Sequence, residues 1–391
     1  MDNTQFERKK SICIVSPQYL PHVGGVENYV YNFSKELAAR GHSITIIASE
    51  MAGAPEYEKD GEIEVYRLPS YSLMKGRMPV LKYNKKVREF SKKFRKMHFD
   101  AMIVMTRFYF MSLWAVKIAK KMGLRCIVLD HGSAHVNTGN RFTSAIGRVF
   151  EHWITAREKR YCKEFAGCSK AVTKWIEHFK IYTDVVLYNA IDVEKFLDLK
   201  AKACRDFRAE YNIPKDDLLI AFVGRLTLEK GLHLLVHAMN KVYEKRKDVH
   251  LLIAGGGYLR EELEKVMCEN VHFVGVIPTP EVAALMNSSN VLCLPSLSTE
   301  GFPTVILEGV VCDNYIITTS GGGAKELITD RDYGIVLPEN TVDELYKAIM
   351  EVADDKEYRE AATARCYDRV INNYTWKHTA DAFLSLIEKD K

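Results

Sequence analysis

Four charged residues in the second half of the chain have the types and positions expected for binding a phosphorylated sugar. Arg225 and Lys230 lie in the stretch GRLTLEKG, which follows an apolar run, and Glu300 and Glu308 flank the apolar stretch of TEGFPTVILEG. An arginine binds a phosphate through two parallel hydrogen bonds and a lysine acts as a point charge, so the two cations suit a diphosphate. Carboxylates accept hydrogen bonds from sugar hydroxyls. Solvated surface charges are the alternative for each residue alone.

Two expected helix starts could supply backbone N–H groups to the same kind of ligand. Pro303 suits a first helical turn because its missing N–H is not needed there, and the amides of residues 304–306 would then lack partners within the helix. Gly24 and Gly25 precede another expected helix, where glycine lets the backbone approach an anion closely. A tight turn remains the alternative at this second position.

The elements that must position these residues alternate between apolar strands and amphipathic helices. A strand at 11–17, a helix at 24–41 and a strand at 42–49 predict a β-α-β unit, and the segment 218–247 starts a second series. Further strands are expected at AMIVMT, CIVLDHG, HLLIAGGG, VHFVGV, NVLCLPS, YIITTS and YGIVLP. This alternation indicates parallel sheets, whose ligands bind beyond the carboxyl ends of the strands.

Length and composition support a globular protein of two domains. The chain has 391 residues, of which 47% are hydrophobic and 27% charged. We expect an N-terminal domain at residues 1–190 and a C-terminal domain at 191–375, with a final helix at 376–391 that packs back onto the first domain. Nine cysteines without a C-x-x-C pair suggest reduced, buried thiols, and the short apolar run near the N-terminus predicts a cytoplasmic protein.

The motifs GGVE, GRLTLEKG and EGFPTVILE occur in an order and spacing that resembles the family-four retaining glycosyltransferases. YNAIDVEKF and LLIAGGGYLREEL extend the resemblance over nearly the whole chain. It implies the α/β GT-B fold, with two facing Rossmann-like, doubly wound parallel-sheet domains and the donor in the interdomain cleft. Ala190 stands where the family usually has glycine, Asn290 where aspartate is common, and Pro303 where many members have glycine.

The resemblance also implies roles for individual residues. Catalysis would involve His131, which follows a first-domain strand, together with Glu300, Arg225 and Lys230. Glu300 would face the transferred sugar and Glu308 the ribose, while base contacts would be made by the backbone near Gly275 and Ile277. The implied donor-binding residues are Gly24, Gly25, Arg225, Lys230, Gly275, Ile277, Glu300, Phe302, Pro303, Thr304, Val305 and Glu308.

The expected activity is transfer of a hexose, with retention, from a nucleoside diphosphate donor to a glycan or lipid-linked acceptor in cell-surface polysaccharide or glycoconjugate synthesis. A UDP-sugar is the preferred donor. We expect no cofactor and no metal site, because the acidic run DRD (330–332) fits a turn. His135, four residues after His131, lacks the alignment that supports His131 as an active-site histidine. The alternatives are a nucleotide-sugar epimerase of similar fold and a non-catalytic nucleotide-sugar binding module. Arg260 breaks the glycine pattern needed for a nicotinamide site.

The segment 74–99 carries ten Lys and Arg against the single acid Glu89, with aromatic residues between them. Such a segment can lie on an anionic membrane through charge and shallow aromatic insertion, and a solvated helix face is the alternative. We expect peripheral attachment to the inner face of the plasma membrane, where a lipid-linked acceptor would be found. Nucleic acid is not an expected partner, because no binding module is recognisable.

Overall fold

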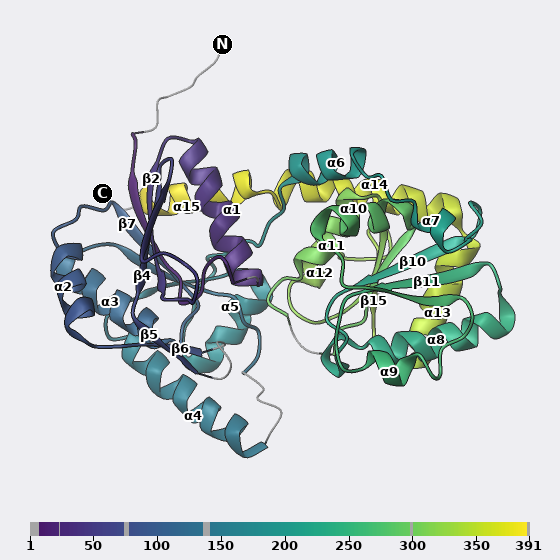
Figure 1. Cartoon of the computed structure of the whole chain (residues 1–391), viewed down its shortest axis with the longest axis horizontal. Helices are drawn as coiled ribbons and strands as arrows, with labels where there is room; N and C mark the ends of the chain where they lie inside the picture. Colours follow the sequence, from purple (N-terminus) through teal and green to yellow (C-terminus); the bar gives the residue numbers. More distant parts are fainter. Residues whose placement is uncertain (1–7, 23, 74–77, 136–140, 298–299, 389–391) are drawn as a thin grey trace, which may run out of the picture. The chain divides into compact units, whose positions relative to one another are not determined.

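The computed structural model describes residues 8–22, 24–73, 78–135, 141–297 and 300–388. The chain divides into two compact units (Figure 1). The first unit contains the chain up to Asn189 together with the segment from Trp376 onward, and the second unit runs from Ala190 to Thr375. Each unit has a predominantly parallel sheet of its own.

The first unit is built on a seven-stranded sheet. Its strands are β1 (Ser11–Val15), β2 (Ser43–Ser49), β3 (Tyr57–Asp60), β4 (Ile63–Leu68), β7 (Ala101–Met105), β8 (Cys126–Asp130) and β9 (Glu164–Gly167). They lie in the order β3-β4-β2-β1-β7-β8-β9, and only β3 runs antiparallel to its neighbour. The central strands are buried and almost wholly apolar, as expected for a sheet covered on both faces. β5 (Ser70–Leu73) and β6 (Met78–Leu81) form a separate antiparallel pair.

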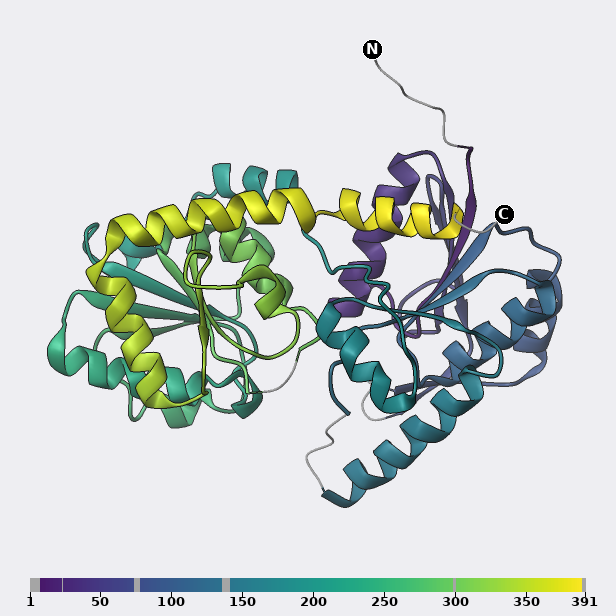
Figure 2. The same ribbon diagram turned by 180° about the vertical axis from the view of Figure 1, so that it is seen from behind.

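Helices surround this sheet, and one of them comes from the C-terminus. They are α1 (Gly25–Ala39), α2 (Lys85–Phe94), α3 (Phe110–Met122), α4 (Arg141–Glu158), α5 (Lys170–Ile176), the 3-10 helix η2 (Glu177–Phe179) and α15 (Trp376–Glu388). The rings of Phe33 on α1 and Phe383 on α15 are 5.4 Å apart. Helix α15 therefore packs on α1 within the first unit (Figures 1 and 2).

The second unit has a six-stranded, wholly parallel sheet in the strand order typical of dinucleotide-binding folds. Its strands are β10 (Leu218–Val223), β11 (Val249–Ala254), β12 (Val271–Gly275), β13 (Val291–Leu294), β14 (Tyr315–Thr319) and β15 (Ile335–Leu337). The order is β12-β11-β10-β13-β14-β15. The chain leaves β10 in one direction across the sheet and returns to its other side with β13, so a topological switch point lies between these two strands.

Two helices of the second unit precede its first strand, and the others follow its strands. The helices are α6 (Val193–Ala201), α7 (Phe207–Glu210), the 3-10 helix η3 (Leu228–Lys230), α8 (Leu232–Lys245), α9 (Arg260–Leu263), α10 (Thr279–Ser288), α11 (Thr304–Val311), α12 (Ala324–Leu327), α13 (Val342–Asp354) and α14 (Lys356–Asn373). In the described part of the chain, no helix combines the length and apolar character needed to cross a bilayer.

The strands predicted from apolar runs are present in both sheets, and the predicted α/β fold class is confirmed. The segment β3 to β6 was not predicted, because β3 and β5 are four-residue strands that are mostly exposed, and β3 is largely charged. Such strands lack the continuous apolar pattern by which buried parallel strands are recognised.

Candidate active site

The switch point of the second sheet brings together two of the loops that carry the predicted charged residues. The loop after β10 contains Arg225 and Lys230, and the loop after β13 contains Glu300. Because β10 and β13 are parallel neighbours, their carboxyl ends lie side by side. The loops that leave those ends are therefore adjacent, although 70 residues separate Lys230 from Glu300 in the sequence.

Backbone contacts hold these two loops against one another. The amide of Leu297 donates to the carbonyl of Glu229 at 2.8 Å. Gly231 has a φ of +68°, and a Cβ at this position would lie 1.9 Å from the carbonyl oxygen of Pro295. Any side chain at Gly231 would therefore push the loops apart, in a backbone conformation that L-residues rarely adopt.

Lys230 and Glu300 form an ion pair across the two loops. The Lys230 ammonium binds Glu300 Oε1, and the hydroxyl of Ser296 donates to the same oxygen at 2.9 Å. The side chains are 17% and 25% exposed, so both remain open to a ligand. Sequence analysis assigned Lys230 to the diphosphate of the donor and Glu300 to the transferred sugar, and the structure places their charged groups in direct contact.

A glycine-rich loop after β14 packs against the backbone of Glu300 and Gly301. Sequence analysis missed this loop. A Cβ on Gly322, which has a φ of +62°, would lie 1.5 Å from the Glu300 carbonyl oxygen. The amide of Gly323 donates to the Gly301 carbonyl at 3.0 Å. The run SGGG directly after an apolar strand was the available signal, since glycines at strand ends mark close backbone approach.

Arg225 is exposed on the same loop as Lys230. Its guanidinium has no hydrogen bond or ion pair to any residue that the structure describes. An arginine that no carboxylate holds keeps all its donors available for an anion. Of the base-contact candidates, Gly275 ends β12 and accepts a hydrogen bond from the Gly255 amide at 2.7 Å. Ile277, in the loop that follows, is partly exposed.

The N-terminus of α11 offers two of the three amides that were predicted to be free. The helix begins at Thr304 with Pro303 as its N-cap. Ile306 donates to the Pro303 carbonyl at 3.3 Å, so the prediction was wrong for this amide, because the first turn closes on the cap residue. The amides of Thr304 and Val305 have no acceptor among the described residues. The Phe302 ring is buried against Tyr374, which leaves only its backbone for a ligand.

Glu308 lies in the interior of α11 and is partly buried. Burial raises the pKa of its carboxyl to about 7, against the opposing attraction of Lys195 on α6. Desolvation disfavours the charged form of an acid, so this carboxyl is close to half ionised at neutral pH.

In the first unit, Gly24 caps α1 next to a buried carboxylate. A Cβ on Gly24 would lie 2.4 Å from Oε2 of Glu27, and Oε1 of the same carboxylate is hydrogen-bonded to Nδ1 of His22 at 2.7 Å. A side chain at Gly24 would require the Glu27 carboxylate to shift, and this carboxylate lies close to the helix start predicted to receive a phosphate. Around Gly25 there is open space for a Cβ.

His131 follows β8 and packs edge-on against the Tyr29 ring at 4.8 Å. Its amide donates to Oδ1 of Asp130 at 2.9 Å, and its Nε2 is buried without a partner among the described residues. Burial lowers the pKa of His131 to about 4, although the Asp130 charge acts in the opposite direction. The imidazole is therefore neutral at physiological pH.

The His131 loop rests on a buried ionic cluster that sequence analysis missed. Arg107, which is 1% exposed, donates through Nε to Asp130 and lies 3.7 Å from Glu151. Its guanidinium also lies over the Phe179 ring, 3.7 Å from the centroid. Burial raises the pKa of nearby Glu158 well above its usual value, with opposing contributions from the Phe108 amide and Arg107. Arg107 follows β7, so an arginine directly after a buried strand was the only local signal.

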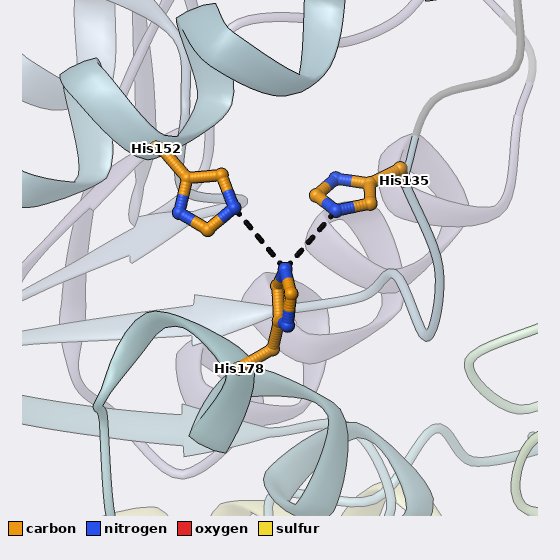
Figure 3. A group of neighbouring side chains, drawn as sticks. All are labelled: His135, His152 and His178. Carbon is orange, nitrogen blue, oxygen red and sulfur yellow. Dashed lines mark hydrogen bonds between the residues drawn. The ribbon is translucent and has the colours of Figure 1, made fainter. Parts of the chain in front are cut away.

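Three histidines of the first unit, His135, His152 and His178, converge on one another (Figure 3). They are a group of the described residues that could bind a metal ion, and sequence analysis had set His135 aside. The acidic run DRD (330–332), considered in the sequence as a possible metal-binding motif, forms a turn as predicted. The Asp332 amide donates to Oδ1 of Asp330 at 2.9 Å.

The two α/β domains, each with a predominantly parallel sheet, have the GT-B fold. Residues 205–369 match the family described as glycosyl transferases group 1, and residues 23–195 match glycosyltransferase family 4. The chain belongs to the family-four glycosyltransferases, as the sequence motifs predicted.

Individual relatives match the chain over nearly its full length. It is 23% identical to an uncharacterized glycosyltransferase of Methanocaldococcus jannaschii, with 98% of this chain and 99% of the relative covered. It is 22% identical to phosphatidyl-myo-inositol mannosyltransferase of Mycolicibacterium smegmatis, covering 96% of this chain and 93% of that protein. The crystal structure of an Anabaena protein in complex with UDP-glucose aligns with a TM-score of 0.72 at 14% identity, over 97% and 99% of the two chains.

Proposed function

We propose that this glycosyltransferase moves a hexose from a nucleoside diphosphate sugar, with UDP preferred, to a glycan or lipid-linked acceptor with retention of configuration. The observation that carries the proposal is the Lys230–Glu300 pair on adjoining loops, with Arg225 on the same loop as Lys230 and two free amides just after Glu300. The mannosyltransferase relative, named for a phosphoinositide lipid, and the Anabaena structure with UDP-glucose support the acceptor and donor classes.

In the proposed reaction, the bond between the anomeric carbon and the diphosphate oxygen breaks, and its electron pair goes to the diphosphate. Arg225, Lys230 and the amides of Thr304 and Val305 stabilise this developing negative charge, an electrostatic effect that is already organised before reaction. These groups supply the positive charge for the leaving diphosphate, so the proposed transfer itself has no metal-dependent step. Gly24 and Gly25 of the first unit keep the role that the family resemblance implies, as residues for the donor phosphates.

The sugar carries positive charge in the transition state, and Glu300 and His131 are assigned to it. Glu300 is released from Lys230 when the lysine turns to the diphosphate, and it then accepts hydrogen bonds from the sugar. A neutral His131 does not repel this cationic carbon. Because Nε2 of His131 is buried, Nδ1 is the ring nitrogen that can form a hydrogen bond with a sugar hydroxyl. The acceptor oxygen attacks on the face that the diphosphate leaves, and the acceptor proton passes to the leaving phosphate oxygen.

The donor assignment is tested by thermal unfolding with a panel of nucleotide sugars, because only a ligand bound to the native state raises the melting temperature.

Glu308 is proposed to accept hydrogen bonds from the ribose, and its ionised fraction rises from roughly a tenth at pH 6 to nine tenths at pH 8, given its pKa of about 7. We expect UDP-glucose to raise the melting temperature more at pH 8 than at pH 6. Glu308→Gln should remove that difference, and an equal shift at both pH values would contradict the role of Glu308.

Product analysis separates the proposed transferase from the two alternatives. With the stabilising nucleotide sugar and a crude lipid extract, a transferase releases a nucleoside diphosphate and forms a glycosylated product. A nucleotide-sugar epimerase changes the donor without any acceptor, and a binding module leaves it intact. Unchanged donor in both conditions would overturn the proposed function.

Attachment to the inner face of the plasma membrane is proposed for the first unit, on a surface that differs from the predicted one. Of segment 74–99, residues 74–77 lie outside the described residues. Phe94 and Phe99 are buried, so the expected aromatic insertion was wrong for both: they pack in the core beside Trp114. The basic residues of α2 are exposed, as predicted, and Tyr83 is 53% exposed.

The exposed apolar side chains lie on α4. Ile146 is 55%, Val149 71% and Trp153 43% exposed, and together they line a groove of about 600 Å³ with Phe110. Helix α3 connects the two regions, since Trp114 bonds Ser91 of α2 and Phe110 packs on Phe150 of α4. A basic helix and an apolar helix face on one domain suit an anionic lipid surface.

Vesicle sedimentation tests this attachment. At low salt, the protein should sediment with vesicles rich in phosphatidylglycerol and remain in solution with purely zwitterionic vesicles. Val149→Asp should lower the bound fraction severalfold, because it puts a charge on the inserting face. Val266→Asp, at a 45% exposed apolar residue of the second unit, is the matched control and should bind as the wild type. Equal sedimentation with both kinds of vesicle would contradict the proposal.

A further inference from the structure

The three histidines of the first unit come from three separate elements. His135 lies in the segment after β8, His152 on α4 and His178 in η2, and their imidazoles point toward one another (Figure 3). Nε2 of His178 lies 3.3 Å from Nε2 of His135 and 3.1 Å from Nε2 of His152. One potential ligand atom from each residue falls within 4.8 Å of the other two.

These separations match the edges of a metal coordination shell. Zinc binds histidine nitrogen at about 2.0–2.1 Å in tetrahedral geometry, which places two such nitrogens about 3.3 Å apart. Two of the three nitrogen pairs already have nearly this spacing.

Hydrogen bonding alone leaves this arrangement incompletely satisfied. Each neutral imidazole has one N–H donor and one bare acceptor nitrogen. Nε2 of His178 faces two other Nε2 atoms, so a single proton on it can be donated well to only one of them. A cation would use the lone pairs of all three nitrogens at once.

A buried carboxylate sets the protonation of one ring in the form that a metal requires. Nδ1 of His135 lies 2.9 Å from Oε2 of Glu151, a residue that is 2% exposed. A proton on Nδ1 is donated to this carboxylate, which leaves the lone pair of Nε2 pointing into the cluster. Carboxylate–histidine pairs of this kind are the usual support of metal-bound histidines.

The surroundings of the three histidines hold one ring in place and leave room for a further metal ligand. The Trp175 ring stacks on His178 with 5.3 Å between the centroids and 13° between the planes, which fixes that ring. His152 and His178 are exposed, so a water can complete a four-coordinate shell.

We infer that His135, His152 and His178 bind one divalent transition-metal ion in the first unit. Three imidazoles suit zinc, and the oxygen ligands that magnesium and calcium prefer are missing from the triad itself. The ion would tie the segment that starts at His131 to α4 and η2. It holds structure there, and no step of sugar transfer passes through it.

Metal titration of the full-length protein tests this site. After dialysis against a chelator, the protein should take up one Zn²⁺ per chain, and Co²⁺ should give the intense visible absorption of a tetrahedral site. His152→Ala and His178→Ala should each weaken binding at least a hundredfold. Both residues are exposed, and far-ultraviolet circular dichroism would confirm that the variants fold.

Two further variants make the test specific. Glu151→Gln keeps the shape of the side chain and should weaken Zn²⁺ binding about ten- to a hundredfold by removing the charge behind His135. His237→Ala, at an exposed histidine of the second unit, should bind as the wild type. Binding that survives His152→Ala, for example at the exposed Cys204, would overturn the site, as would the absence of stoichiometric uptake.

Discussion

Replacing Lys230 with alanine should lower the rate of sugar transfer by about a hundred- to a thousandfold. This lysine is the cation held between the two switch-point loops, and removal of one preorganised group that stabilises developing charge typically has an effect of this size. Donor affinity should fall as well, by roughly ten- to a hundredfold, because a charge-assisted contact to phosphate is lost. Initial rates of nucleoside diphosphate release and calorimetric titration with UDP measure the two effects.

The fold should tolerate this change. Lys230 and Glu300 are partly exposed, and Glu300 keeps its hydrogen bond from Ser296, so the free energy of unfolding should fall by no more than about 1 kcal/mol. Lys241→Ala is the matched control, since it breaks another lysine–carboxylate pair, with Asp343, on the surface of the same unit. Transfer at a near-normal rate by the Lys230 variant would refute the assignment of the active site.

Replacing Arg107 with methionine should destabilise the first unit by about 3–5 kcal/mol. The substitution keeps a long side chain but leaves buried Asp130 without its cation, and removing one partner of a buried ion pair has a cost of this order. A decrease in the melting temperature of about 10 °C is expected.

Arg125→Met provides the comparison for this variant. Arg125 pairs with Glu164 at 2.7 Å, but that pair is partly exposed, and its loss should lower the melting temperature by only about 3 °C. Sugar transfer should also suffer in the Arg107 variant, since Asp130 accepts hydrogen bonds from the amides of His131 and Gly132. Equal melting temperatures for the two variants would show that the buried cluster is not a stabilising unit.

The predictions that succeeded were those that depend on neighbours in the sequence. Apolar runs and helical periodicity located the strands of both sheets, because burial on both faces of a parallel sheet requires continuous apolar residues. The short motifs around Arg225, Lys230 and Glu300 were recognisable because chemistry at strand ends needs particular residue types in order. The same reasoning went wrong for Phe94 and Phe99, because a basic segment was interpreted without knowing which of its faces meets α3.

The contacts that depend on folding could not be found in this way. Local sequence was enough to determine the fold class, the family and the candidate charged residues, since propensity, periodicity and turn chemistry act over a few neighbouring positions. Only the tertiary structure decided that Lys230 pairs with Glu300, that Arg107 lies among buried carboxylates, and that His135, His152 and His178 converge. The physical reason is that strand order and helix packing bring together side chains whose separation in the sequence carries no recurring pattern.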